Sequence, residues 1–77
     1  MTSSRIAAIG EDARIGGFAL AGVFVAAADD ADAMLARWEA LPADVGVVIL
    51  TPGAYTALSA AGVLARAGAP LWTVMAR

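Results

Sequence analysis

Short apolar runs alternate with longer amphipathic or Ala-rich segments along the chain. Four apolar runs predict β-strands, at residues 5–9, 23–27, 45–50 and 71–75. Three segments between them predict helices, at about residues 13–21, 31–41 and 52–67. Because strand and helix alternate, the pattern favours β-α-β units and hence an α/β domain with a parallel sheet.

Several residue types predict where these elements begin and end. Asp29 and Asp30 are candidates to cap the second helix, because an Asp side chain accepts from a free N–H in the first turn. Thr51 as N-cap and Pro52 at the first helical position predict a sharp start for the third helix. Gly68 is the predicted stop of that helix. An apolar stripe in the second helix is formed by Met34, Leu35, Trp38 and Leu41.

Connection rules then predict the arrangement of the sheet. Since crossovers between parallel strands are right-handed, a strand order of 2-1-3-4 places the second and third helices on one face and the first helix alone on the other. We therefore expect a single domain over residues 1–77, a small three-layer or incomplete flavodoxin-like (Rossmann-like) fold with four parallel strands and three helices. One face of this sheet would have too few helices to cover it, and exposed apolar sheet usually marks an interface.

The last strand and the third helix supply the candidate interface residues. In the strand, Leu71 and Met75 alternate with Trp72 and Val74, so either face would present apolar side chains. The third helix carries no charge from Pro52 to Ala65, which indicates a partner surface or simply an Ala-rich composition. The predicted interface is Tyr55, Leu71, Trp72, Val74 and Met75.

Composition and charge exclude several classes of function. The chain is 61% hydrophobic and 16% charged, with a formal net charge of −2 and five scattered basic residues, so no basic stripe is present for nucleic acid. With neither Cys nor His, the commonest metal ligands and the commonest general base are missing, and a reducing cytoplasm suits the chain. The uncharged run Val45–Ala65 has the length of a membrane span, but Thr51-Pro52-Gly53 interrupts it. No signal peptide is expected.

Catalytic motifs are not complete in this sequence. Glu11 and Asp12 follow the first strand as an acidic pair does in phospho-receiver domains, but the third strand ends in Leu-Thr-Pro and the chain has no Lys. The glycines at 10, 16 and 17 match no nucleotide-binding spacing. Ser59, Thr51 and Tyr55 have no His or Lys to activate them. We therefore expect no enzyme activity, no cofactor and no metal.

The stretch Ile6–Val23 carries a resemblance to a known family. Its strand, Gly10, acidic pair and Gly17-Phe18-Ala19-Leu20-Ala21-Gly22 helix end resemble the opening of the F subunit of the V/A-type (vacuolar/archaeal-type) ATPases. The likeness continues more weakly through Asp29-Asp30-Ala31 and Ala69-Pro70-Leu71. Two features depart from the family: Pro52-Gly53-Ala54-Tyr55 stands where an acid-rich helix is usual, and the C-terminal helical segment associated with regulation does not follow the last strand.

The resemblance implies a non-catalytic rotor component of the central stalk in a proton- or sodium-translocating ATPase. Such a component would bind the coiled-coil stalk subunit and take part in ion transport and ATP synthesis without touching the membrane, as a cytoplasmic, peripheral part of the complex. Two alternatives remain open from the residues. One is a small self-associating adaptor or scaffold module, and the other is a ligand-binding domain that uses the carboxyl ends of the strands.

Overall fold

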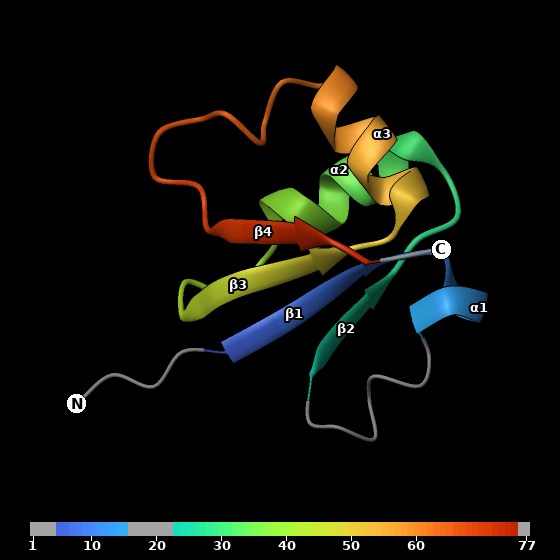
Figure 1. The fold of residues 1–77 in the computed structure, drawn as a ribbon, viewed down its shortest axis with the longest axis horizontal. Coiled ribbons are helices and arrows are strands. Elements are labelled where there is room, and N and C mark those ends of the chain that lie inside the picture. Colours follow the sequence, from blue (N-terminus) through green and yellow to red (C-terminus); the bar gives the residue numbers. More distant parts are fainter. Residues whose placement is uncertain (1–4, 16–22, 76–77) are drawn as a thin grey trace.

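Four parallel strands form one sheet in the order β2-β1-β3-β4 in the computed structural model (Figure 1). The strands are β1 (Arg5–Gly10), β2 (Phe24–Ala27), β3 (Val45–Leu50) and β4 (Leu71–Val74). The structure describes residues 5–15 and 23–75. The predicted α/β class, the parallel sheet and the strand order are confirmed.

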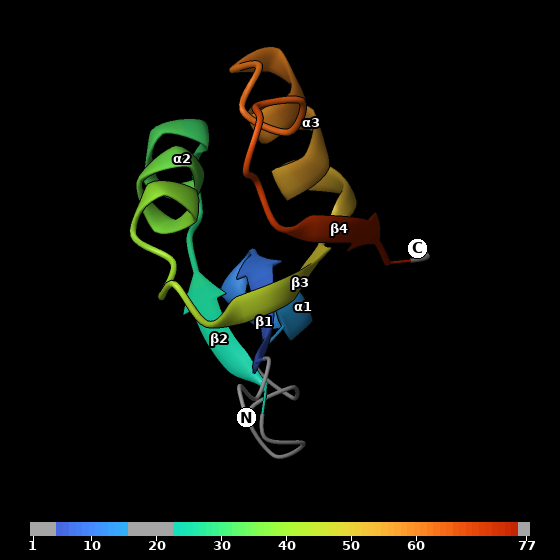
Figure 2. The ribbon, with the colours of Figure 1, turned by 90° about the vertical axis from the view of Figure 1, so that its left-hand side faces the viewer.

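The helices of the described residues are shorter than the sequence predicts. Two of them, α2 (Ala31–Glu39) and α3 (Pro52–Ala60), have nine residues each, whereas α1 (Asp12–Ile15) is a single turn of four. Of the three predicted helices the described residues therefore contain two of more than one turn, and positions 16–21 of the predicted first helix lie outside them. Figure 2 shows α2 and α3 together on one side of the sheet, as the crossover rule requires.

Helix α2 begins and packs as its sequence predicts. The Asp30 side chain accepts a hydrogen bond of 2.7 Å from the backbone N–H of Ala33, which confirms it as the N-cap. Met34 and Trp38, one turn apart, are buried against the sheet. The helix ends at Glu39, shortly before Pro42.

Helix α3 begins as predicted but ends seven residues early. The Thr51 hydroxyl accepts from the N–H of Ala54 at 3.2 Å, and Pro52 occupies the first turn. The helix stops at Ala60 because Gly62, at φ 76°, turns the chain in the left-handed region and donates its N–H to Ser59. The predicted end near Ala67, with Gly68 as the stop, is wrong.

The core lies between α2, α3 and one face of the sheet. The register pairs Ala7 with Val48 and Ile9 with Leu50, and since paired residues of parallel strands share a face, these side chains form two rows. All four are fully buried in the same hydrophobic cluster, which Leu58 of α3 joins. Ala8 points to the opposite face and is also fully buried, outside that cluster.

The long uncharged run Val45–Ala65 is divided among three elements. It forms β3, α3 and the turn that follows Gly62. Among the residues that the structure describes, no helix has both the length and the hydropathy needed to cross a bilayer. The interruption at Thr51-Pro52-Gly53 thus separates a strand from a helix, as its residues predict.

Candidate functional site

Strand β4 exposes every one of its four side chains. Leu71 is the most accessible large apolar residue of the described chain at 74% exposed. Trp72 and Val74 are exposed to 38% and 37%, and Met75 directly after the strand is half-buried. This strand lies at the edge of the described sheet, beyond β3, so only one of its two long edges is paired.

The predicted interface residues fall on two different faces of the sheet. Trp72 lies on the α3 side, where its ring centroid is 5.5 Å from that of Tyr55 at an interplanar angle of 37°. Val74 shares this face because side chains alternate along a strand. Leu71 and Met75 point to the opposite face. The structure therefore brings Tyr55 and Trp72 together and separates them from Leu71.

A patch of apolar side chains covers part of the face opposite α2 and α3. The register aligns Ile6 of β1, Val47 of β3 and Leu71 of β4 in one row across three strands. Ile6 is 48% exposed, and Val47 is half-buried between its two neighbours. With the adjoining residues this open-face patch consists of Ile6, Val47, Ile49, Leu71, Thr73 and Met75.

A charged pair borders the open-face patch at the amino end of the sheet. The Arg5 Nε lies 3.0 Å from Asp44 Oδ2, and the backbone N–H of Arg5 donates to the Asp44 carbonyl at 2.9 Å. Arg5 precedes Ile6 on β1, while Asp44 precedes β3. An apolar centre with a polar rim is the usual composition of a protein interface.

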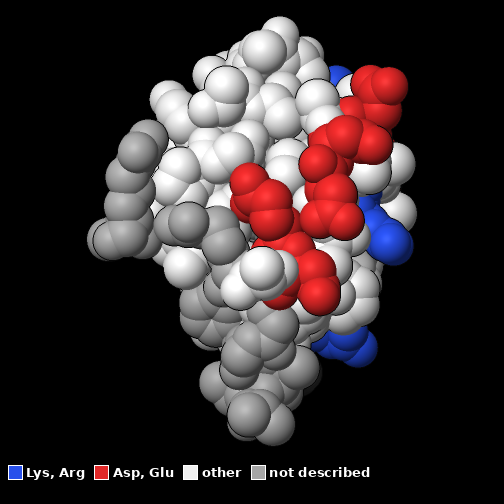
Figure 3. Space-filling model, turned by 90° about the vertical axis from the view of Figure 1, so that its right-hand side faces the viewer, with Lys and Arg blue, Asp and Glu red and all other residues white. Residues whose placement is uncertain are grey.

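Acidic side chains gather at the other end of the molecule. Figure 3 shows them on one face, and the sequence places them where β1 and β2 end and where α1 and α2 begin. The set is Glu11, Asp12, Asp29, Asp30 and Asp32. The described residues nevertheless contain no group of three or more His, Cys, Asp or Glu side chains arranged to hold a metal ion. This end of the molecule is therefore negatively charged, and its described side chains are not arranged as a metal-binding site.

Glu11 has a structural contact within that acidic end. Its Oε1 accepts a hydrogen bond of 2.6 Å from the hydroxyl of Thr51, which is fully buried. The same hydroxyl oxygen caps α3 by accepting from Ala54. Thr51 therefore links the ends of β1 and β3, and the link gives the acidic residue directly after β1 a structural contact.

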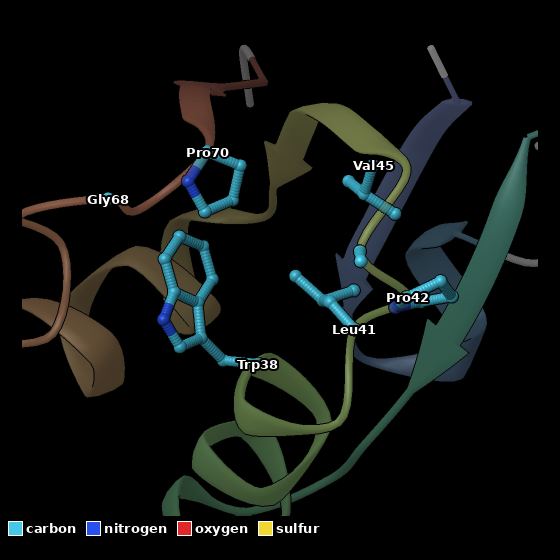
Figure 4. Close-up of a pocket in the computed structure, with 7 residues that line it drawn as sticks. Trp38, Leu41, Pro42, Val45, Gly68 and Pro70 are labelled. Atoms are coloured by element: carbon cyan, nitrogen blue, oxygen red, sulfur yellow. The ribbon is translucent and has the colours of Figure 1, made fainter. Parts of the chain in front are cut away.

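Two shallow pockets lie beside the loop between α3 and β4. One, of about 240 Å³, lies between α2 and that loop and is shown in Figure 4. Its lining residues are Trp38, Leu41, Pro42, Ala43, Val45, Gly68 and Pro70. The other, of about 280 Å³, has Tyr55, Ser59 and Trp72 in its wall. No Asp, Glu, Lys, Arg or His side chain lines either pocket, and Tyr55 in the second pocket is the one titratable side chain of the two linings.

Comparisons with known proteins add no further constraint. No family model, curated protein or solved structure matches this chain. The family suggested by residues 6–23 therefore stays a prediction, and the site is defined by its geometry.

Sequence reasoning found the exposed strand but missed Ile6. That residue lies in a run predicted only as a strand, with Ala7 and Ile9 on the core side. The alternation of side chains was the available signal, because Ile6 has to point away from those two residues. Its alignment with Leu71 depended on the register, which the sequence does not specify.

Proposed function

We propose that this chain is a non-catalytic docking component of the central rotor stalk of a V/A-type ATPase, similar in role to the F subunit of that family. In this role it binds the coiled-coil stalk subunit on the cytoplasmic side and contributes to proton or sodium transport through the complex. The observation that carries the proposal is the open-face patch, where Ile6 and Leu71 are 48% and 74% exposed in one cross-strand row.

The physical reason for docking is the apolar area left in water. Burying apolar surface stabilises a complex by roughly 25 cal/mol per Å², before the entropy of association is subtracted. Isolated exposed apolar residues are common, but Ile6, Val47 and Leu71 are contiguous across three strands. A partner that covers this row removes it from water without burying any charge of the patch itself.

The shape of the surface favours a helical partner. In flavodoxin-like sheets a helix that follows the last strand shares the face of the first helix. Among the described residues, this face of the sheet carries the single turn α1. One helix of the stalk coiled coil, lying across β1, β3 and β4, would cover the open-face patch.

The experiment is co-purification of this chain with the coiled-coil stalk protein of the same organism. The wild-type chain is expected to be retained, and Leu71→Arg and Ile6→Arg are expected to weaken retention at least about tenfold by placing a charge in the buried centre. Ala36→Arg adds the same charge at an exposed position of α2 and serves as the matched control. Failure of the wild type to bind, or equal binding by Leu71→Arg, would contradict the proposal.

A further inference from the structure

The free edge of β4 has a defined set of unpaired backbone groups. The N–H of Met75 donates to the Leu50 carbonyl at 2.8 Å, so the backbone groups of Met75 face β3. Since these groups alternate in direction along a strand, Thr73 also faces β3, and Trp72 and Val74 direct their N–H and C=O groups outward. Within the described residues the outward edge therefore presents two donors and two acceptors.

This edge lacks the usual protection against pairing with another strand. Proteins blunt such edges with charged side chains, especially Lys, with Pro or with bulges. Residues Leu71–Val74 contain none of these, and Pro70 stands just before the strand. The ion pair between Arg66 and Glu39, with nitrogen and oxygen 3.1 Å apart, joins the loop after α3 to α2 and lies outside the strand. Within the described residues 71–75, two copies of β4 can therefore approach without bringing like charges together.

We propose that a second copy of this chain pairs with β4 in antiparallel orientation, with Thr73 on the two-fold axis. In this register Trp72 lies opposite Val74 of the other copy. Both residues direct their backbone groups outward, so each of the two symmetric pairs exchanges two hydrogen bonds, and all four outward groups of each strand are satisfied. Thr73 lies opposite its own copy as a pair without backbone hydrogen bonds.

Other registers pair Trp72 or Val74 with a residue outside Leu71–Val74. An axis at Trp72 would place Val74 opposite Pro70, which has no N–H to donate. A two-fold axis at Val74 would place Trp72 opposite residue 76, which lies outside the residues that the structure describes. The register centred on Thr73 also pairs the aromatic Trp72 with the β-branched Val74, and Thr73 with Thr73 of the other copy. Both kinds of cross-strand contact are favourable.

The dimer is weak and leaves the open-face patch accessible. A four-residue edge covers much less than the roughly 800 Å² per partner of a stable interface, so we expect dissociation in the range of about 0.1–1 mM. The axis is perpendicular to the sheet, so both patches lie on the same side of the joined eight-stranded sheet. The dimer thereby combines two docking surfaces into one.

Single cysteines test the register, because the natural chain has none. In the proposed dimer the two Thr73 Cα atoms are about 4.5 Å apart, which suits a disulfide, whereas the two Leu71 Cα atoms are separated by roughly 13 Å. Under mild oxidation Thr73→Cys is expected to form covalent dimers at least about tenfold faster than Leu71→Cys, although both positions are exposed in the wild type. Equal rates, or no cross-link at Thr73→Cys, would overturn the proposal.

Sedimentation equilibrium supplies an independent measurement. Val74→Pro removes an outward N–H while leaving the pairing with β3, and Val74→Thr keeps that N–H. We expect concentration-dependent dimers from the wild type and Val74→Thr, and monomers from Val74→Pro. A wild type that remains monomeric at about 1 mM would contradict the dimer. If Val74→Pro does not fold, the cross-linking rates of Thr73→Cys and Leu71→Cys decide whether the proposed dimer forms. The stalk protein is in neither assay, so the outcome is separate from that of the proposed function.

Discussion

The hydroxyl of Thr51 donates a 2.6 Å hydrogen bond to Oε1 of Glu11, across forty positions of sequence. The contact joins the residue after β1 to the residue after β3, at the carboxyl end of two central strands. Thr51 is the one buried polar side chain among the described residues. Its two hydrogen bonds tie the start of α3 to the sheet, and several consequences for stability follow from this geometry.

Replacing Thr51 by Val is expected to lower the free energy of unfolding by about 2 kcal/mol. The substitution keeps the volume but removes both the cap on α3 and the donor to Glu11. Thr51→Ser keeps both hydrogen bonds and loses only a methyl group, so it is the control, with an expected loss of about 1 kcal/mol or less. Urea denaturation measures both. Equal losses for Val and Ser would show that the hydroxyl contributes nothing.

Adding a methyl group at Gly10 is expected to destabilise the fold more than adding one at Gly53. A Cβ at Gly10 would overlap Cγ2 of the buried Thr51, which has no room to move. A Cβ at Gly53 would overlap only Oε2 of Glu11, the end of a flexible side chain. We expect Gly10→Ala to lose about 2–3 kcal/mol and Gly53→Ala about 1 kcal/mol or less, in the same urea titration. The reverse order would contradict the close packing at Gly10.

The two tryptophans are expected to contribute unequally to stability. Trp38 is 6% exposed in the core, and its replacement by Ala should lower the free energy of unfolding by about 3–5 kcal/mol. Trp72 is 38% exposed and contacts Tyr55 on one side, so Trp72→Ala should lower it by only about 1–2 kcal/mol. A double-mutant cycle with Tyr55→Ala should give a coupling of about 0.5–1.5 kcal/mol. Zero coupling would mean that the ring contact does not persist in solution.

The ion pair between Arg66 and Glu39 is expected to add little. Its nitrogen and oxygen are 3.1 Å apart, but both side chains are about half exposed, so water and salt screen their attraction. Arg66→Gln should lower the free energy of unfolding by less than about 1 kcal/mol, and the difference from the wild type should vanish in 1 M salt. A larger loss that salt does not reduce would indicate a packing role for the arginine stem.

Local residue chemistry was enough to predict much of the fold. Asp30, Thr51 and Pro52 act within one helical turn of themselves, so their roles as caps and first-turn residue depend on nothing distant. The strand order follows from crossover handedness, which holds for almost all parallel sheets. The end of α3 was mispredicted because seven further residues are mostly good helix formers, and Gly62 carried the only stop signal.

The candidate surface was less accessible to sequence reasoning. Exposure of Leu71 and Trp72 could be foreseen from a last strand with an apolar pattern. Their separation onto two faces follows from the alternation of side chains along the strand, but the approach of Tyr55 to Trp72 depends on how α3 lies over β4. The partnership of Ile6 with Leu71 depends on a register shift between Arg5 and Ile6, an irregularity that no local pattern encodes.

The distribution of acidic side chains gives the molecule a permanent electric moment. Five of its seven acidic residues lie where β1 and β2 end, whereas Glu39 and Asp44 lie elsewhere and pair with Arg66 and Arg5. Electrostatic forces orient such a molecule as it approaches a charged partner, because its acidic end is attracted to positive charge and repelled by negative charge. Encounters with an acidic partner would thus begin at the opposite pole, beside Arg5 and Ile6.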